Sequence, residues 1–333
     1  MAECTPDSFK ILLGKLVKTP EYFTPEDLEL SLHHLFTPDA ALPAQTGAFL
    51  AALHIGRSTI VGTGGDGHNT FNVSTTAAVV AAGAGARVIK ASTSSSGSAD
   101  LLQSLDCLFT APSQGTSFPI SKMPFTFILA PHYHPALAMI APYRKSLPFR
   151  TLFNVLGPLI NPARPRGMVL GVAERELGPT FVQSLHEGGV ERALVVCGAE
   201  GLDEISCAGN TYAWQLVDGK ITETTLHPDL FGLSTHPLTS VAGGTPTENA
   251  ETFKALLNSG NDIPESLTPV LHFVLLNASA LLVVAGLASD FKEGVALAMN
   301  SITSGSAWDA FVVFRNASRE SVKETNEVEK KEI

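Results

Sequence analysis

The stretch VGTGGDGHNTFNVST, Val61 to Thr75, decides the fold of this chain. It follows a short apolar run and leads into small and apolar residues from Ser74 to Gly83, which is the order strand, glycine-rich turn, helix. Glycines let backbone N–H groups approach an anion closely, and the start of a helix adds unpaired N–H groups with a partial positive charge. The stretch predicts either a phosphate-binding loop or a plain glycine turn capped by Ser74, and composition alone favours neither.

Two better-known glycine motifs are excluded by their context. Gly62, Gly64 and Gly67 fit the spacing G-x-G-x-x-G, but a dinucleotide fold also needs an acidic residue about 20 residues further on. Here no Asp or Glu follows Gly67 until Asp100. The pattern G-x-x-x-x-G-K-[ST] is absent as well, so the loop is not that of a P-loop NTPase.

Short apolar runs alternate with helical patterns after residue 58. We expect strands at Thr59–Val61, Arg87–Ile89, Phe125–Leu129, Met168–Val172 and Ala193–Val196, and helices at Ser74–Gly83, Leu177–Glu187, Thr247–Asn258 and Pro269–Leu287. Strands that alternate with helices indicate an α/β fold with parallel strands.

Residues before this region are expected to be helical. Leu12, Leu13 and Leu16 recur at helical spacing, Thr24 precedes a proline as a helix cap does, and a further short helix is expected from Ala44 to His54. We therefore predict a small helical domain at 1–57, with 132–150 packing on it. An α/β domain at 58–318 and a charged, frayed tail at 319–333 complete the chain.

Composition narrows the function classes. The 333 residues are 44% hydrophobic and 16% charged, which suits a buried core, and the net charge of −10 argues against nucleic-acid binding. The apolar run from Phe273 to Ala288 is too short to span a bilayer, so we expect a core helix and no membrane partner. Four cysteines without zinc spacing and an N-terminus without a targeting pattern favour a cytoplasmic protein with reduced thiols.

The glycine loop is part of a wider resemblance. From Gly62 to Thr75 the chain resembles the signature GTGGDGxNTFNxST of the anthranilate phosphoribosyltransferase family. Further segments resemble that family in order and spacing, over residues 5 to 318: Ser96–Asp100 (SGSAD), Pro131–Pro135 (PHYHP), Arg150–Leu159 (RTLFNVLGPL), Gly201–Ser206 (GLDEIS) and Gly243–Asn249 (GGTPTEN). Several motifs in one order are more specific than any single one.

The resemblance implies a fold and an activity. The fold would be a small helical lobe plus a large α/β lobe with a mainly parallel central sheet, as in nucleoside phosphorylases and phosphoribosyltransferases. The enzyme would transfer 5-phosphoribosyl from phosphoribosyl pyrophosphate (PRPP) to anthranilate, with Mg²⁺, in tryptophan biosynthesis. A homodimer formed through the helical lobe is also implied. No catalytic residue is expected, because the anthranilate amine is already a nucleophile and positioning is what it needs.

The resemblance also assigns site residues. PRPP would be bound by Gly62, Thr63, Gly64, Gly65, Asp66, Asn72, Ser74, Thr75, Lys90 and Ser96, and anthranilate by Gly62, His134 and Arg144. Arg144 would hold the anthranilate carboxylate through its planar guanidinium. The metal residues would be Ser74, Asp203 and Glu204. By themselves, two adjacent carboxylates after an apolar strand suit Mg²⁺ but also fit a solvated acidic turn.

Two departures from the family pattern affect the expected activity. Lys90 runs directly into Ala91, where the family has Lys-His-Gly, and only a few residues separate Leu53 from Ile60, where the family has more helix. We expect the chain to bind PRPP with Mg²⁺ and to turn over anthranilate poorly or not at all. Two alternatives therefore stand beside the transferase: an impaired member that binds PRPP, and a pyrimidine nucleoside phosphorylase-like enzyme, which would use free phosphate.

Overall fold

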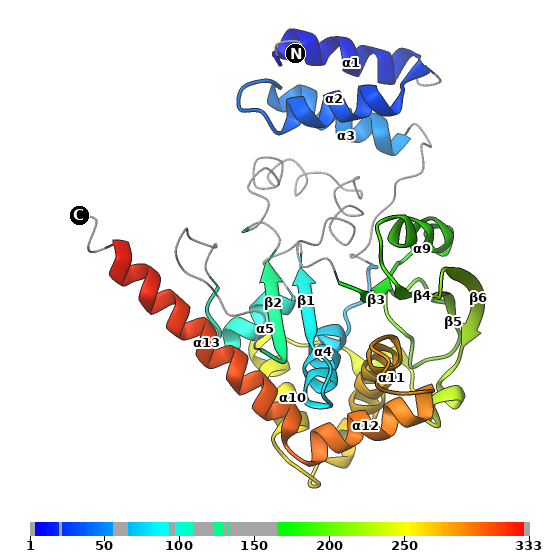
Figure 1. Cartoon of the computed structure of the whole chain (residues 1–333), viewed down its shortest axis with the longest axis vertical. Coiled ribbons are helices and arrows are strands. Elements are labelled where there is room, and N and C mark those ends of the chain that lie inside the picture. The colour runs from blue at the N-terminus through cyan, green and yellow to red at the C-terminus, as the bar shows by residue number, and fades with distance from the viewer. Residues whose placement is uncertain are drawn as a thin grey trace. The chain divides into compact units, whose positions relative to one another are not determined.

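The computed structural model describes residues 4–19, 22–55, 66–92, 97–109, 123–129, 132 and 165–329 (Figure 1). The chain divides into two compact units. Described residues up to 55 belong to a helical unit, and those from 66 onward belong to a larger α/β unit. The expected strand at Thr59–Val61 and the segment 133–150 lie outside the described residues.

The helical unit consists of α1 (Pro6–Lys18), α2 (Pro25–Leu35) and α3 (Pro43–Ile55) in its described part. These helices lie where the sequence predicts helices. They pack around a small core of Phe9, Leu12, Leu16, Leu35 and Phe49. The rings of Phe9 on α1 and Phe49 on α3 lie 5.5 Å apart between centroids, within the range of favourable aromatic pairs.

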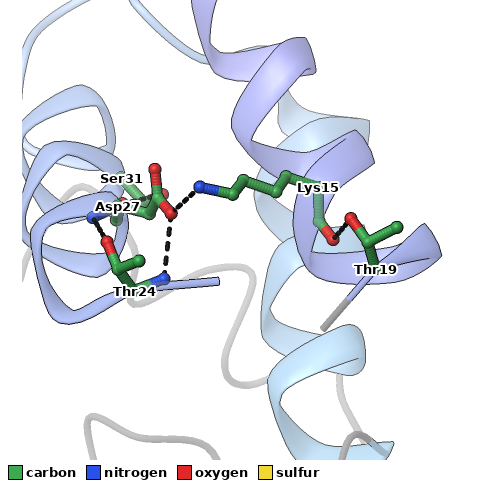
Figure 2. A network of polar contacts seen from close by, with 5 residues as sticks. All are labelled: Lys15, Thr19, Thr24, Asp27 and Ser31. Carbon is green, nitrogen blue, oxygen red and sulfur yellow. Dashed lines mark hydrogen bonds and ion pairs between the residues drawn. The ribbon is translucent and has the colours of Figure 1, made fainter. Parts of the chain in front are cut away.

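A polar network fixes the start of α2 against α1 (Figure 2). Thr24 accepts a hydrogen bond at Oγ1 from the backbone N–H of Asp27, 3.3 Å away, and the Asp27 carboxylate accepts one from the N–H of Thr24 at 2.9 Å. This reciprocal pair is a capping box, and Pro25 occupies the first helical position. Lys15 of α1 forms an ion pair with the same Asp27 carboxylate. The cap that the sequence predicts at Thr24 is confirmed, and it also links the two helices.

The strands of the α/β unit form two sheets within the described residues. β1 (Val88–Ser92) pairs in parallel with β2 (Phe125–Leu129). β3 (Gly167–Gly171) pairs in parallel with β4 (Arg192–Gly198). These parallel pairs and the helices between them confirm the α/β fold class that the sequence predicts.

The second sheet also contains a hairpin that the sequence pattern did not predict. β5 (Thr211–Val217) runs antiparallel to β4, and β6 (Lys220–Leu226) runs antiparallel to β5. Asp218 and Gly219 connect them with φ angles of 51° and 72°. A two-residue turn with both φ angles positive matches the twist of a hairpin, and Asp-Gly is a preferred pair for it.

Helices cover the sheets of the α/β unit (Figure 1). Their bounds are α4 (Val73–Gly83), α5 (Ser98–Ser104), α9 (Leu177–Glu187), α10 (Pro246–Leu257), α11 (Thr268–Val284), α12 (Phe291–Thr303) and α13 (Ser306–Glu329), with short 3₁₀ turns η3 (Pro228–Phe231), η4 (Leu238–Val241) and η5 (Glu265–Leu267). α9 packs on β4 and β5, whereas α11 packs on β3 and β4. α4 is enclosed by α11, α12 and α13, and its residues Ala77 to Ala82 are all buried.

The apolar helix α11 is longer than the apolar run in the sequence. From Glu265 to Val284 the chain is helical, long enough and apolar enough to cross a membrane by length and composition. However, 72% of that apolar window is buried inside the protein. Its neighbours are α4, α12 and β3. The expectation that it is too short is therefore corrected, and its burial places it as a core helix.

The charged C-terminal segment differs from the expectation of a frayed tail. α13 continues through Glu329, so the backbone of residues 319–329 is helical. This stretch, RESVKETNEVE, has no glycine or proline and is rich in glutamate. Because straight-chain charged residues are good helix formers, charge alone does not end the helix.

Candidate functional site

The described part of the glycine loop begins at Asp66. Its Oδ1 accepts a hydrogen bond from the backbone N–H of His68, 3.1 Å away, across Gly67 at a φ of 81°. The His68 Nε2 lies 3.1 Å from the carbonyl oxygen of Glu200. The segment 199–206 after β4 contains Glu200, Asp203 and Glu204 and is called the acidic loop. This hydrogen bond joins it directly to the glycine loop, although His68 and Glu200 are 132 residues apart in the sequence.

The motif GGTPTEN, Gly243–Asn249, also contacts the glycine loop. The Asn69 side chain donates to the Gly243 carbonyl at 2.8 Å, and the Gly243 N–H donates to the Asn69 carbonyl at 2.9 Å. A Cβ atom added at Gly243 would lie 2.6 Å from the carbonyl oxygen of Thr70. Only glycine fits this approach, so Gly243 has a structural reason to be in the motif.

The start of α4 has no side-chain cap. Asn72 is the N-cap residue, but its side chain makes no capping hydrogen bond. Its Oδ1 instead accepts a hydrogen bond from Asn249 at 2.9 Å. Thr75 donates to Ser98 on the second predicted phosphate loop at 2.8 Å. No acidic residue occupies the first turn of α4. A helix start without a side-chain cap is suited to an anion such as phosphate.

The acidic loop lies at the carboxyl ends of the parallel strands β3 and β4. The Gly198 N–H donates to the Leu202 carbonyl at 2.8 Å, and Ser206 Oγ donates to the Glu200 carboxylate. Gly171, the last residue of β3, lies so close that an added Cβ would be 1.5 Å from the Asp203 carbonyl oxygen. The loop therefore rests on the end of β3, the edge where open α/β sheets bind ligands.

Four other predicted site residues interact with the Glu204 carboxyl group: Asp66, Ser74, Lys90 and Asp203. Burial raises the pKa of its carboxyl to about 8, with a further contribution from the negative charges of Asp203 and Asp66. The positive charge of Lys90 and a hydrogen bond from Ser74 act in the opposite direction, lowering the pKa. The structure thus brings together Ser74 and Lys90 with the acidic pair, although the acidic loop lies far along the sequence from α4 and β1.

These side chains fit a magnesium ion that receives further ligands from its substrate. The donors are hard oxygens, and the excess of carboxylates over the Lys90 ammonium favours a cation. Within the described residues, no group of three or more His, Cys, Asp or Glu side chains is placed to hold a metal. Mg²⁺ commonly binds to one or two carboxylates, and the phosphates of the substrate and water complete its coordination.

The remaining predicted site residues lie outside the described residues. On the PRPP side these are Gly62, Thr63, Gly64, Gly65 and Ser96, and on the anthranilate side Gly62, His134 and Arg144. Their roles stay predictions.

Sequence reasoning missed three residues that hold the site together: His68, Asn249 and Asn277. Asn249 ends the motif GGTPTEN, which does not reveal its contact, and Asn277 carried a signal of its own as a single amide inside the apolar run of α11. A buried amide needs hydrogen-bond partners, so its position in such a run indicates a specific contact.

Comparisons with known proteins identify the family. A family model described as "Glycosyl transferase family, a/b domain" matches residues 58–308. The anthranilate phosphoribosyltransferase of Schizosaccharomyces pombe is 43% identical over 320 residues, covering 85% of this chain and 89% of the relative. The chain belongs to the anthranilate phosphoribosyltransferase family. The enzyme of Herpetosiphon aurantiacus is 39% identical over 298 residues, covering 80% of this chain and 87% of that relative.

Solved structures of this family have the same fold. The Saccharomyces cerevisiae anthranilate phosphoribosyltransferase in complex with PRPP and Mg matches with a TM-score of 0.83 at 28% identity, covering 95% of this chain and 99% of that chain. The Thermus thermophilus enzyme matches with a TM-score of 0.70 at 34% identity, covering 94% and 95%. The family resemblance that the sequence motifs indicate is therefore confirmed.

The alignment with the S. pombe family member also bears on the two departures. The alignment is 320 positions long, but it includes only 85% of the 333 residues of this chain, which is fewer than 320 residues. Some positions of the alignment are therefore gaps in this chain. This is the result expected if segments of the relative have no counterpart here.

Proposed function

We propose that this chain transfers the 5-phosphoribosyl group from PRPP to the amine of anthranilate. The products are N-(5-phosphoribosyl)anthranilate and pyrophosphate, in the pathway to tryptophan. The observation that carries the proposal is the meeting of Ser74 and Lys90 with the acidic pair Asp203 and Glu204 beside the uncapped start of α4. A family member with this fold has been solved in complex with PRPP and Mg.

On the PRPP side, the start of α4 is proposed to receive phosphate. Its N–H groups and the hydroxyls of Ser74 and Thr75 offer donors, and Lys90 adds a positive charge nearby. The residues that would hold Mg²⁺ are Ser74, Asp203 and Glu204. When bound there, the ion supplies charge stabilisation for the departing pyrophosphate.

The chemistry needs no general base from the chain. The nitrogen of the anthranilate amine forms a bond to the anomeric carbon of the ribose, and the bond from that carbon to the pyrophosphate oxygen breaks. Pyrophosphate leaves with the bonding electrons, and the new ammonium group loses its proton to water. The chain's contribution is to hold the two substrates in line and to stabilise the developing negative charge.

The anthranilate side and the assembly are extensions of the same proposal. Gly62, His134 and Arg144 would bind anthranilate, with the Arg144 guanidinium on its carboxylate. A homodimer through the helical unit fits the exposed apolar side chains of α1, where Ile11 is 75% and Val17 is 59% accessible. A cytoplasmic location stays a prediction.

A fluorescence assay for anthranilate consumption tests the proposed function. We expect slow consumption that requires both PRPP and Mg²⁺, with pyrophosphate released in equal amount. Consumption of a pyrimidine nucleoside with inorganic phosphate, without any reaction of anthranilate, would instead favour the phosphorylase alternative. PRPP binding without turnover at any substrate concentration would identify an impaired member of the family.

A further inference from the structure

One buried amide contacts the acidic loop from the core of the protein. Asn277 lies on α11, and 4% of its surface is accessible. Its Oδ1 accepts a hydrogen bond from the backbone N–H of Ile205 at 3.0 Å, and its Nδ2 donates to the Ile205 carbonyl at 3.2 Å. The Nδ2 also donates to the carbonyl of Phe273, one turn earlier in α11, at 3.0 Å.

Ile205 directly follows Glu204, so these hydrogen bonds hold the backbone of the acidic loop itself. The N–H of Ile205 belongs to the peptide unit that leaves Glu204, and its carbonyl belongs to the next peptide unit. One side chain therefore fixes the orientation of two consecutive peptide planes. Both backbone groups belong to a fully buried residue and need partners away from water. Their orientation sets the direction in which the Glu204 side chain leaves the backbone.

The helix that carries Asn277 is a rigid support. Residues Phe273, Leu276 and Ala278 beside it are fully buried, and α11 packs against α4, α12, β3 and β4. The bond from Nδ2 to the Phe273 carbonyl holds the amide against its own helix. Because α11 also packs on α4, whose first turn carries Ser74, one helix supports both proposed sources of metal ligands.

We propose that Asn277 is a positioning residue for the metal site, whose amide holds the peptide units after Glu204 so that Asp203 and Glu204 bind Mg²⁺ together with Ser74. This inference rests on the proposed function, because it assigns Mg²⁺ to that loop. Asn277 touches neither substrate nor metal in this arrangement, and its effect passes through the backbone of Ile205. Groups that orient metal ligands in this way commonly change metal affinity about 10- to 100-fold when replaced.

The test uses Asn277→Leu, with Ser279→Ala as the matched control. Leu keeps a similar volume and removes the hydrogen bonds to Ile205. Ser279 is also buried on α11, but its hydroxyl donates to the Phe291 carbonyl at 2.7 Å and not to the acidic loop. Calorimetric titration of PRPP at a series of Mg²⁺ concentrations gives the Mg²⁺ required for half-maximal binding. We expect at least about a tenfold increase for Asn277→Leu and no change for Ser279→Ala.

Amide hydrogen exchange at Ile205 gives a second readout that needs no ligand. Exchange at this amide should become faster in Asn277→Leu and stay unchanged in Ser279→Ala. Asn277→Asp keeps the size and the acceptor for the Ile205 N–H but loses the donors, so its Mg²⁺ requirement should lie between those of the unmodified chain and the Leu variant. If the Leu variant does not fold, Asn277→Asp decides the question.

Each outcome separates the inference from the proposed function. A folded Asn277 variant with an unchanged Mg²⁺ requirement would overturn the inference alone, as would an equal shift in Ser279→Ala. If the unmodified chain shows no Mg²⁺-dependent binding of PRPP, both the inference and the proposed function are overturned. A raised Mg²⁺ requirement together with faster exchange at Ile205, both confined to the Asn277 variants, supports it.

Discussion

Glu204 has two carboxylates near it, Asp66 and Asp203, and one ammonium group, that of Lys90. When all of these are ionised, the group carries more negative than positive charge. Burial and the like charges raise the pKa of Glu204 to about 8, against the lowering effect of Lys90 and Ser74, so the surroundings disfavour the ionised carboxylate. A divalent cation at this place would supply the missing positive charge, and the phosphates of PRPP would then share it.

Replacement of both acidic residues, Asp203→Ala with Glu204→Ala, should therefore remove the metal site. We expect turnover of anthranilate to fall at least ~100-fold, by analogy with the loss of a main electrostatic stabiliser, and its Mg²⁺ dependence to disappear. Steady-state rates across a Mg²⁺ series measure both effects.

The matched control removes two exposed carboxylates elsewhere in the same unit, Asp262→Ala with Glu265→Ala. It should leave the rate and the Mg²⁺ dependence unchanged. An Asp203/Glu204 double variant that keeps the Mg²⁺ dependence of the unmodified chain would refute the assignment of the metal to this loop.

At the residue scale, the sequence offers candidate ligands but does not show which residues position them. Asp203, Glu204 and Ser74 were named as candidate metal residues because the family resemblance implies that role, whereas the adjacent carboxylates by themselves also fit a solvated acidic turn. Asn249 and His68 lie inside quoted motifs, but their contacts were not predictable, because their partners are Asn72 and a backbone carbonyl in segments more than 130 residues away. Contacts of that range depend on the fold as a whole and leave no local pattern.

At the scale of elements, the packing of α9 on β5 depends on one glycine. A Cβ added at Gly178 would lie 2.1 Å from ring atoms of Trp214, which is itself buried. No real Cβ contact is that short, so the indole ring or the helix would have to move. Helix propensity acts in the opposite direction, because alanine is favoured over glycine inside a helix by roughly 0.5–1 kcal/mol.

Gly178→Ala should destabilise the α/β unit despite that gain in helix propensity. We expect the overpacking to lower the free energy of unfolding by at least about 1 kcal/mol, measured by denaturant unfolding with tryptophan fluorescence as the signal. Gly14→Ala in α1 is the control, since a Cβ there meets nothing within 4 Å. It should fold as well as the unmodified chain. A Gly178→Ala protein as stable as the control would show that the Trp214 contact adapts without cost.

Helices and strands whose apolar residues recur at a regular spacing were predictable from the sequence. The β5–β6 hairpin was not, because β6 lacks such a spacing. The residues of β6, KITETTL, are mostly exposed and lack alternating apolar positions. Their signals are the threonines, which favour strands, and the Asp218-Gly219 turn. The alternation of strands and helices indicates parallel strands and does not include this hairpin. Its two antiparallel strands extend the sheet without a connecting helix.

At the scale of the whole molecule, the site depends on parallel strands that end at common edges. β1 carries Lys90 and β3 ends at Gly171 beneath the acidic loop. The order of strands and helices in the sequence was sufficient to predict an α/β fold with such edges. That order could not predict the hydrogen bonds from Asn277 on α11 to Ile205, because the order of strands and helices does not determine which helix contacts which loop.

The gap that the family pattern predicts after Lys90 lies at the end of β1. In β1, Lys90 pairs with Phe127, and Ala91 and Ser92 take the last two places of the strand, opposite Ile128 and Leu129. A longer chain here would place other residues at the end of this strand and move Ala91 and Ser92 into the following loop. The family's His-Gly segment would then stand at the carboxyl end of β1, where a loop can close over substrates, exclude water and fix their geometry.

Insertion of His-Gly-Gly-Lys between Lys90 and Ala91 tests whether this gap limits the reaction. Because residues 88–90 pair with β2 ahead of the insertion point, β1 should still form. We expect the unmodified chain to bind PRPP with Mg²⁺ and to turn over anthranilate slowly, and the insertion to raise turnover at least about tenfold with little change in PRPP binding. A loop that adds only transition-state geometry changes turnover more than affinity.

An insertion of the same length and without histidine, Gly-Gly-Gly-Lys, separates chain length from chemistry and should restore less. If neither insertion changes the rate, the shortened connection between Leu53 and Ile60 becomes the better explanation for slow turnover. If the unmodified chain already works at ~1–1000 per second, a rate ordinary for enzymes, then the residues absent after Lys90 are not required and the prediction is wrong.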